Sequence, residues 1–262
     1  MVNRNKETGF MAYLSNLKVL RQFAASHPTI YRLLQDRLTI KRFTGLPLTL
    51  LLSACLTNLL LIMDFVEDVI NSKELIEIDR RVADFLFSLR TDFMAVLFYW
   101  FTFLCSVTVV TIISILCIGI LLIKKKYVHV KSIIVTLIGS TITIYFGKKM
   151  FEIDRPHHYA YYFENSYSFP SGHTTIAVAF YGLLFYFMIR SSRSFKSRVL
   201  LSILSIGFVC SIGFSRLYLC VHFLSDVIAG LLIGSLWMFV AIGLYEWMRY
   251  KNITAERLPS SQ

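Results

Sequence analysis

Six stretches of this 262-residue chain contain no aspartate, glutamate, lysine or arginine, and they constrain its fold more than any other feature. They are Phe43–Met63, Phe93–Ile123, Ser132–Gly147, Thr174–Ile189, Val199–Ser215 and Val227–Tyr245. Most of them are close to the roughly 20 apolar residues that a helix needs to cross the hydrocarbon core of a bilayer. A soluble helical bundle would not need six such runs. We therefore predict an all-α integral membrane protein with six transmembrane helices.

The charged residues between these runs indicate how the helices are oriented. If both termini are cytoplasmic, the inside segments are 1–42, 124–131, 190–198 and 246–262, and they hold 19 of the 27 Lys and Arg residues. The same segments hold only 4 of the 16 acidic residues, which is the positive-inside bias of membrane proteins. The net charge of +11 therefore reports topology and attraction to anionic lipid, and it does not require a nucleic-acid partner.

Apolar residues at helical spacing also occur outside the six runs. Within residues 1–42 they are interleaved with basic residues, which favours helices on the cytoplasmic membrane surface; a solvated tail is the alternative. From Leu75 to Leu89 they recur within an acidic loop, which predicts an amphipathic helix at the outer interface. We divide the chain into a cytoplasmic segment 1–42, one six-span domain 43–248 and a cytoplasmic tail 249–262.

The stretch Phe169-Pro170-Ser171-Gly172-His173 lies where a polar loop enters the fourth apolar run. Pro, Ser and Gly are typical of a turn that leads into a helix. The first turn of such a helix has free backbone N–H groups and the positive end of the helix dipole, which together favour an anion. His173 adds a group that can donate or accept a proton. Because Pro-Ser-Gly is also an ordinary turn, the assignment depends on what else reaches this place.

Three cations and a second histidine lie at the same ends of the apolar runs. Lys148 and Arg155 follow the third run, and they share a helical face if the helix continues. Arg216 follows the fifth run. His222 precedes the sixth run, and Asp226 lies one turn further on the same face, where its carboxylate can orient the imidazole. Alternating spans bring all of them to the outer face, where cations suit a phosphate dianion and two histidines suit a nucleophile and a general acid.

These residues resemble a known family as a set. Lys148 with Arg155-Pro156, then Pro170-Ser171-Gly172-His173, then Ser215-Arg216 with His222 and Asp226 resemble the three signature motifs of the type-2 phosphatidic acid phosphatase family. That family includes lipid phosphate phosphatases and vanadium haloperoxidases. All three motifs are complete and in order, and the resemblance covers roughly residues 45–248.

The resemblance implies a role for each motif residue. It implies that His222 attacks phosphorus and forms a phosphohistidine, that Asp226 orients it, and that His173 protonates the leaving oxygen. It further implies that water hydrolyses the phosphoenzyme and that neither a metal nor another cofactor takes part. The implied phosphate-binding residues are Lys148, Arg155, Ser171, Gly172 and Arg216.

We therefore expect a bacterial inner-membrane lipid phosphatase whose active site faces the periplasm and whose partners are the bilayer and a phosphorylated lipid. Undecaprenyl diphosphate is the first candidate substrate, since outward-facing phosphatases of this kind commonly recycle the polyprenyl carrier. Phosphatidylglycerophosphate, phosphatidic acid and lipid A phosphates are alternatives. A lipid-to-lipid phosphotransferase would use the same phosphohistidine, and a membrane scaffold or transporter is the non-enzyme alternative. Six spans and a site at the lipid interface argue against a haloperoxidase.

Overall fold

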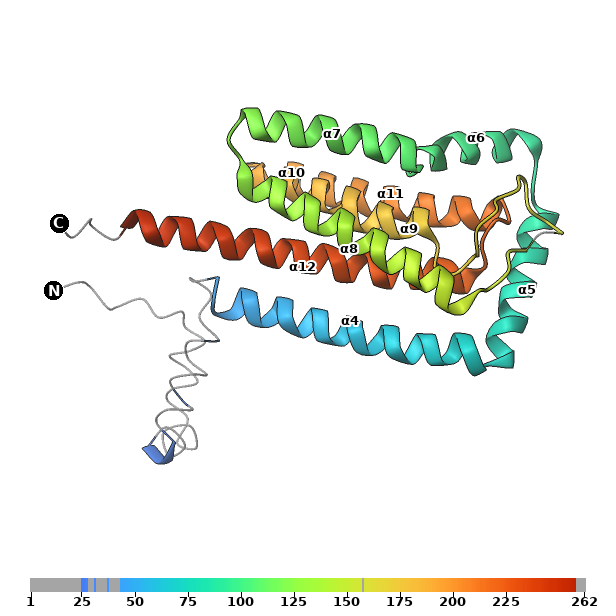
Figure 1. Ribbon diagram of the computed structural model, residues 1–262, viewed down its shortest axis with the longest axis horizontal. Helices are drawn as coiled ribbons and strands as arrows, with labels where there is room; N and C mark the ends of the chain where they lie inside the picture. Colours follow the sequence, from blue (N-terminus) through green and yellow to red (C-terminus); the bar gives the residue numbers. More distant parts are fainter. Residues whose placement is uncertain (1–24, 28–30, 32–36, 38–42, 157, 258–262) are drawn as a thin grey trace. The chain divides into compact units, whose positions relative to one another are not determined.

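The computed structural model describes residues 25–27, 31, 37, 43–156 and 158–257, and the regular structure of these residues is entirely helical (Figure 1). The elements are α4 Leu46–Asn71, α5 Lys73–Ser88, α6 Asp92–Phe103, α7 Val107–Ile123, α8 Tyr127–Phe151, α9 Gly172–Ile176, the π-helical turn η1 Ala177–Tyr181, α10 Gly182–Ser191, α11 Phe195–Tyr218 and α12 Leu224–Arg257. The helices predicted within residues 1–42 lie largely outside the described residues.

Six helical stretches are long and apolar enough to cross a membrane. They are Leu46–Asn71, Asp92–Ile123, Tyr127–Phe151, Gly172–Ser191, Phe195–Tyr218 and Leu224–Thr254. The prediction of an all-helical, multi-pass membrane protein with six spans is confirmed, while the side on which the termini lie stays a prediction. The chain divides into two compact units, Met1–Leu52 and Ser53–Gln262, and every predicted site residue lies in the second.

Apolar side chains of the spans are widely exposed, as lipid-facing residues are. Leu56 of α4 is 59% exposed and Ile115 of α7 is 64% exposed. The interior face of α8 instead includes several small polar residues. Ser132, Thr136 and Ser140 are buried and donate hydrogen bonds to carbonyl groups of their own helix. Small residues let membrane helices approach closely, so α8 takes a central place in the bundle.

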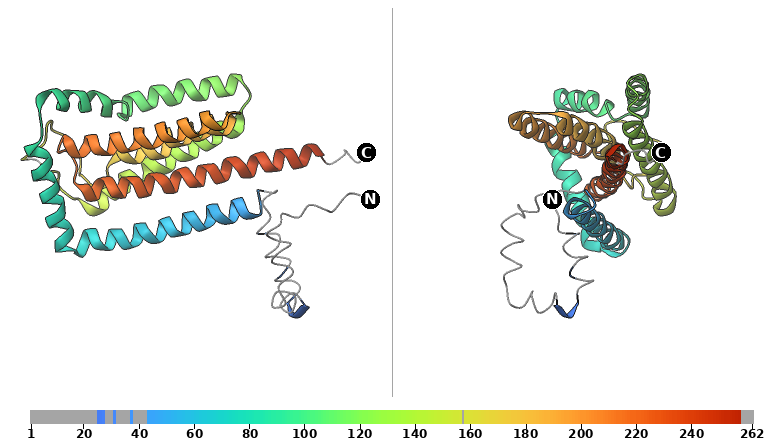
Figure 2. Two further views of the ribbon diagram at one scale, coloured as in Figure 1. Left: turned by 180° about the vertical axis from the view of Figure 1, so that it is seen from behind. Right: turned by 90° about the vertical axis from the view of Figure 1, so that its left-hand side faces the viewer.

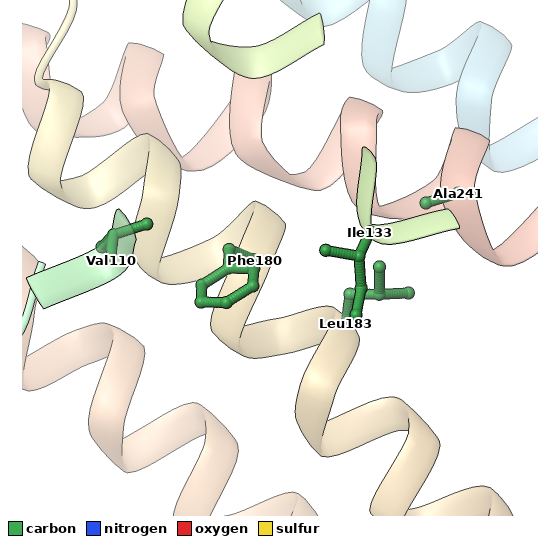
Figure 3. Packing of buried hydrophobic residues seen from close by; sticks show 5 residues of the cluster. All are labelled: Val110, Ile133, Phe180, Leu183 and Ala241. Atoms are coloured by element: carbon green, nitrogen blue, oxygen red, sulfur yellow. The ribbon is translucent and has the colours of Figure 1, made fainter. Parts of the chain in front are cut away.

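One apolar cluster joins four of the spans (Figure 3). It consists of Val110 of α7, Ile133 of α8, Phe180 of η1, Leu183 of α10 and Ala241 of α12. All five side chains are buried, and four of the five have no exposed surface. α12 runs along α8 and along the fourth span, α9 to α10, over much of its length (Figures 1 and 2). The fourth span, which holds His173 in its first turn, and α12, which follows His222, are therefore anchored in the same core.

Two glycines of α12 permit the close approach of the fourth span. A Cβ at Gly230 would lie 2.9 Å from the carbonyl oxygen of Ser171, and a Cβ at Gly234 would lie 2.7 Å from that of Thr175. Their spacing of four residues matches the small-residue pattern of closely packed membrane helices. Because of this contact, the start of α9 lies directly against the first turns of α12, where Asp226 is found.

The second apolar run, expected to be one span, contains two helices. α6 ends at Phe103 and α7 begins at Val107. The hydroxyl of Ser106 caps α7 by accepting the N–H of Val109 at 3.4 Å. The hydroxyl of Tyr181 donates to the carbonyl of Leu104 at 2.5 Å. These side chains satisfy backbone groups that a break in a membrane helix would leave unpaired. Residues of this break form part of the wall of a cavity.

The acidic loop contains the predicted amphipathic helix, α5. The hydroxyl of Ser72 accepts the N–H of Leu75 at 3.2 Å and caps its first turn. Ala83 and Leu86 are buried against the bundle, whereas Phe85 is 62% exposed. One face of α5 thus packs against the bundle, and other apolar side chains of the same helix are exposed. Its location at the membrane interface stays a prediction.

Candidate active site

The three motifs come together because a single loop crosses from the end of α8 to the start of α9. α8 stops at Phe151, since Glu152 takes a left-handed conformation with φ of 48°. Lys148 therefore lies in the last turn of the helix, while Arg155 is carried by the loop. The two cations would share a helical face only in a helix that continues to Arg155, and α8 does not continue that far. The loop nevertheless folds back and brings the two side chains into contact with the same residue, Ser166.

A cavity of about 410 Å³ opens between this loop and the helices below it. Its polar end is lined by Lys148, Arg155, Glu164, Ser166, Gly172, His173 and His222. Its remaining walls come from the α6–α7 break, α7, α8 and α9, and they consist of Cys105, Val107, Val110, Thr111, Ser114, Leu137, Thr141, Ile144 and Ile176. Both histidines therefore face one space, which is charged at one end and mainly apolar at the other.

His222 is held in a defined orientation at the polar end. Its side chain is buried, with Nδ1 at 3.2 Å from Oδ2 of Asp226 and Nε2 at 3.2 Å from Nη1 of Arg155. A guanidinium can only donate, so Nε2 accepts and the ring proton resides on Nδ1, which donates to the carboxylate. Oδ2 of Asp226 also accepts the N–H of Phe223 at 2.8 Å and the hydroxyl of Ser168. The carboxylate is thereby fixed, and it fixes the imidazole in turn.

The surroundings of His222 disfavour its protonation. Burial lowers the pKa of His222 well below its usual value, and the nearby guanidinium groups of Arg216 and Arg155 lower it further. At neutral pH the imidazole is therefore uncharged and Nε2 keeps its lone pair. This is the protonation state that a histidine nucleophile requires.

Arg155 is the most connected cation of the site. Its Nε donates to the carbonyl of Ser166 at 2.7 Å, and its Nη1 donates to the carbonyl of Val221 at 2.7 Å. Its Nη2 forms an ion pair with Glu164 at 2.5 Å. These bonds tie the loop before α9 to the segment before α12, so Arg155 holds together the two chain segments that carry the histidines.

Arg216 lies deeper and has no exposed surface. Its Nη2 pairs with Glu164 at 2.6 Å, and its Nη1 donates to the hydroxyl of Tyr162. Its Nε is buried and has no hydrogen-bond partner in the described part of the chain. A buried guanidinium with an unpaired N–H suits an anion that brings more than one oxygen.

The structure places the residues around Gly172 in two different ways. Gly172 and His173 line the cavity. Ser171 does not, because its N–H donates to the carbonyl of Asp226 at 3.0 Å and its hydroxyl lies 3.0 Å from that of Thr174. Ser171 is fully buried and joins α9 to α12. Of the five residues expected to bind phosphate, Lys148, Arg155 and Gly172 line the cavity, whereas Ser171 and Arg216 stand behind it.

Sequence reasoning missed Glu164, which joins the two arginines. Burial alone would raise the pKa of its carboxyl group, but Arg216 and Arg155 outweigh burial and hold that pKa at about 2. The carboxylate is therefore charged at any physiological pH. A signal was present in the sequence, since Glu164 is the only acidic residue between Asp154 and Asp226.

A second missed carboxylate comes from α5. Asp79 is buried and accepts the N–H of Ser225 at 2.9 Å and its hydroxyl at 2.6 Å. Asp79 therefore caps the start of α12 from another helix. The residue that it holds, Ser225, lies between His222 and Asp226 in the chain. Asp79 follows Leu75 by one helical turn, and an acid on the apolar face of an amphipathic helix was the readable signal.

Comparison with known proteins identifies the family of the region that carries the motifs. Residues 129–252 match the family model described as the PAP2 superfamily. Residues 129–252 belong to the PAP2 superfamily. The PAP2 region contains all eight predicted site residues, from Lys148 to Asp226, whereas Asp79 lies outside it.

Individual relatives cover different parts of the chain. Phosphatidylglycerophosphatase B of Bacillus subtilis (strain 168) is 34% identical over 100 residues, which are 38% of this chain and 49% of that protein. The match thus spans about half the length of this curated relative. Among solved structures, a transmembrane PAP2 type phosphatidylglycerolphosphate phosphatase from Bacillus subtilis is similar with a TM-score of 0.62 and 20% identity, covering 79% of this chain and 98% of that one. Aquifex aeolicus LpxE aligns with a TM-score of 0.49 and 24% identity, over 63% of this chain and 94% of its own. The first solved structure shares its fold with most of this chain.

Proposed function

We propose that this protein is a membrane lipid phosphatase that hydrolyses a phosphomonoester or diphosphate lipid through a phosphohistidine at His222. The observation that carries the proposal is the lone pair of His222 Nε2 beside Arg155, at the polar end of a cavity with apolar walls. A neutral, oriented imidazole next to a cation cluster suits attack on phosphorus. The apolar walls suit the chain of a lipid.

The proposed reaction has two steps. In the first, Nε2 of His222 attacks phosphorus, the bond from phosphorus to the lipid oxygen breaks, and His173 gives that oxygen a proton. In the second, water attacks phosphorus, the bond from phosphorus to Nε2 of His222 breaks, a proton of the water goes to His173, and inorganic phosphate is released. Lys148, Arg155 and Arg216 stabilise the charge on the transferred phosphoryl group throughout.

Asp226 has an orienting role in this scheme. It accepts the Nδ1 proton and stabilises the positive charge that the ring carries in the phosphohistidine. Ser171 and Gly172 have different proposed roles in phosphate binding, because only Gly172 lines the cavity. Gly172 can offer its backbone to the phosphate, whereas Ser171 holds α9 against α12.

Glu164 has to give way for phosphate to bind. Its two oxygens contact the two guanidinium groups that a phosphate dianion would use. Binding therefore exchanges one anion for another, and the arginines need not be desolvated again. Such an exchange lowers the cost of keeping two buried cations in place.

The lipid chain is proposed to lie between α7 and α8. Thr111 of α7 and Thr141 of α8 line the cavity together with apolar neighbours on both helices. A cavity of about 410 Å³ accommodates the phosphate end and the first part of a chain, and the rest of the lipid remains in the bilayer. This geometry supports a reaction at the membrane boundary.

For the substrate, we propose a phosphorylated lipid of bacterial membranes. Undecaprenyl diphosphate, the first candidate from the sequence, stays within this class. The name of the 34% identical relative favours phosphatidylglycerophosphate, and phosphatidic acid and lipid A phosphates are further candidates. We further propose that the protein lies in the bacterial inner membrane with cytoplasmic termini and a periplasmic active site, which the distribution of Lys and Arg supports.

The proposal is tested with the purified full-length protein in detergent and a panel of these four lipid classes. We expect phosphate release from at least one of them, an acid-labile phosphoenzyme, and loss of both in His222→Ala. Activity should persist after chelation of divalent metals. Full activity of a folded His222→Ala protein would contradict the mechanism, and transfer of labelled phosphate to a second lipid instead of water would identify a phosphotransferase.

A further inference from the structure

A second cavity, of about 290 Å³, lies between the α7–α8 connection and the last turns of α12. Figure 1 shows this end of the helices on the left and the loop before α9 on the right. Arg249, which lines the cavity, is 23 residues after Asp226 on α12, so the cavity is about 35 Å from the candidate active site at 1.5 Å per residue. The cavity is thus separate from the one that holds the histidines.

The α7–α8 connection is built so that two lysines reach this cavity. The N–H of Lys125 donates to the carbonyl of Leu122 at 2.9 Å, and the N–H of Lys126 donates to that of Leu121 at 2.8 Å. This is the Schellman pattern, and Lys125 has the left-handed conformation that it needs, with φ of 54°. The tight turn brings both lysines to the start of α8, beside α12.

The opposite wall comes from one face of α12. The lining residues of α12 are Tyr245, Arg249, Asn252 and Ile253. Each of the other three lies three or four positions from Arg249, which places them all on the same side of the helix. Lys125, Lys126 and Arg249 therefore surround one space, and none of the described residues that line it is acidic. In the described part of the chain none of these three cations forms an ion pair. Like charges around one cavity favour an anion between them.

His129 adds a polar group to the same cavity. Its ring packs against Phe187 and Tyr245, each with ring centroids 4.8 Å away. Its Nδ1 is buried and has no hydrogen-bond partner in the part of the chain that the structure describes. The cavity thus combines three cations with an aromatic wall and an unpaired polar atom.

We propose that this cavity binds the phosphate group of an anionic phospholipid. The choice of a lipid rests on two exposed apolar side chains: Ile123, two residues before Lys125, is 84% exposed, and Ile253, which lines the cavity, is 41% exposed. These residues continue the lipid-facing surfaces of α7 and α12, so a headgroup bound between the cations leaves its chains beside apolar side chains. Basic pockets between transmembrane helices are known to recognise anionic headgroups. The bound lipid would join the α7–α8 connection to α12.

The test compares lipid binding by three proteins: the wild type, a cavity variant and a control variant with equal charge loss. The cavity variant is Lys125→Gln/Lys126→Gln/Arg249→Gln. The control is Lys124→Gln/Arg193→Gln/Lys196→Gln, whose three residues are exposed and do not line the cavity. Native mass spectrometry of the full-length protein in detergent measures binding of phosphatidylglycerol and of phosphatidylcholine with the same chains. Because phosphatidylglycerol could also bind at the active site, only the difference between the two triple variants reports on this cavity.

We expect wild type and the control to prefer phosphatidylglycerol by at least about tenfold, and the cavity variant to lose most of that preference. Arg249→Gln alone should weaken binding in the same direction, which keeps the test valid if the triple variant does not fold. Equal binding of the two lipids by wild type would overturn the proposal. So would equal behaviour of the two triple variants, or displacement of the lipid by inorganic phosphate at a similar concentration.

Discussion

Arg216 and Glu164 form an ion pair of 2.6 Å in which the arginine side chain has no exposed surface. The second carboxylate oxygen lies 2.5 Å from Nη2 of Arg155. One carboxylate therefore joins two guanidinium groups with two oxygens, as a bound phosphate could. The candidate active site carries its own internal anion, and a phosphate has to replace it.

The first prediction concerns this replacement. Glu164→Gln removes the competing charge, so inorganic phosphate and vanadate should inhibit more strongly, with inhibition constants lower by about tenfold, equivalent to about 1.4 kcal/mol. The matched control is Asp154→Asn, which lies on the same loop, is exposed and should change little. Because the pKa of Glu164 is about 2, the difference between wild type and Glu164→Gln should be constant from about pH 5 to 8. Weaker inhibition of Glu164→Gln would show that the carboxylate mainly orders the arginines.

The second prediction concerns pH. Burial and the two arginines lower the pKa of His222, and the neutral ring is the proposed nucleophile. The acid limb should therefore lie below neutral pH, with activity falling as the pH drops through this lowered pKa, below the usual 6.5. The acid limb of kcat/KM, measured with a soluble short-chain substrate, reports it. Arg216→Gln removes one of the cations, so whatever activity remains should have its acid limb at higher pH. A wild-type limb above pH 7 would contradict this account.

The third prediction concerns Asp79, which we regard as a positioning residue. Asp79→Asn replaces a charged acceptor at the start of α12, and hydrogen bonds to charged groups contribute about 1.5–3 kcal/mol. We expect kcat to fall by about tenfold with little change in KM, because His222 loses orientation while the lipid cavity is intact. Glu74→Gln, on the exposed side of the same helix, is the control. A change in thermal stability without a change in kcat would limit Asp79 to folding.

The fourth prediction concerns the lipid chain. Thr111→Trp places a large ring in the cavity wall contributed by α7. KM for a long-chain lipid substrate should rise by about tenfold, while a soluble short-chain phosphate should be hydrolysed almost as before. Ile112→Trp, which is exposed and does not line the cavity, is the control. Equal effects of Thr111→Trp on both substrates would place the chain elsewhere.

The fifth prediction concerns topology. Asn165 is exposed on the loop before α9 and does not belong to the candidate site. A cysteine at this position should react with a membrane-impermeant maleimide in intact spheroplasts. A cysteine at Arg193 should react only after permeabilisation. The five native cysteines are free thiols and Cys210 is exposed, so the parent protein is the necessary blank. The reverse labelling pattern would invert the proposed orientation.

Much of the membrane architecture could be predicted because it depends on local properties. A run without charges is enough to define a span, since the bilayer core excludes charged side chains whatever the neighbouring helices do. The break between α6 and α7 escaped prediction, because Ser106 and Leu104 carry no strong signal of a helix end. The partner of the Leu104 carbonyl is Tyr181, which is distant in the sequence and is brought there by helix packing.

The sequence by itself determined the six spans, the order of the three motifs and the pairing of His222 with Asp226, because each depends on residues close together in the chain. Only the tertiary structure decided that Ser171 is buried between α9 and α12 and that α8 ends before Arg155. It also revealed two carboxylates, since Glu164 meets Arg216 across 52 positions and Asp79 meets Ser225 across 146. Contacts between such distant residues arise from how the helices pack, and no local pattern of residues specifies them.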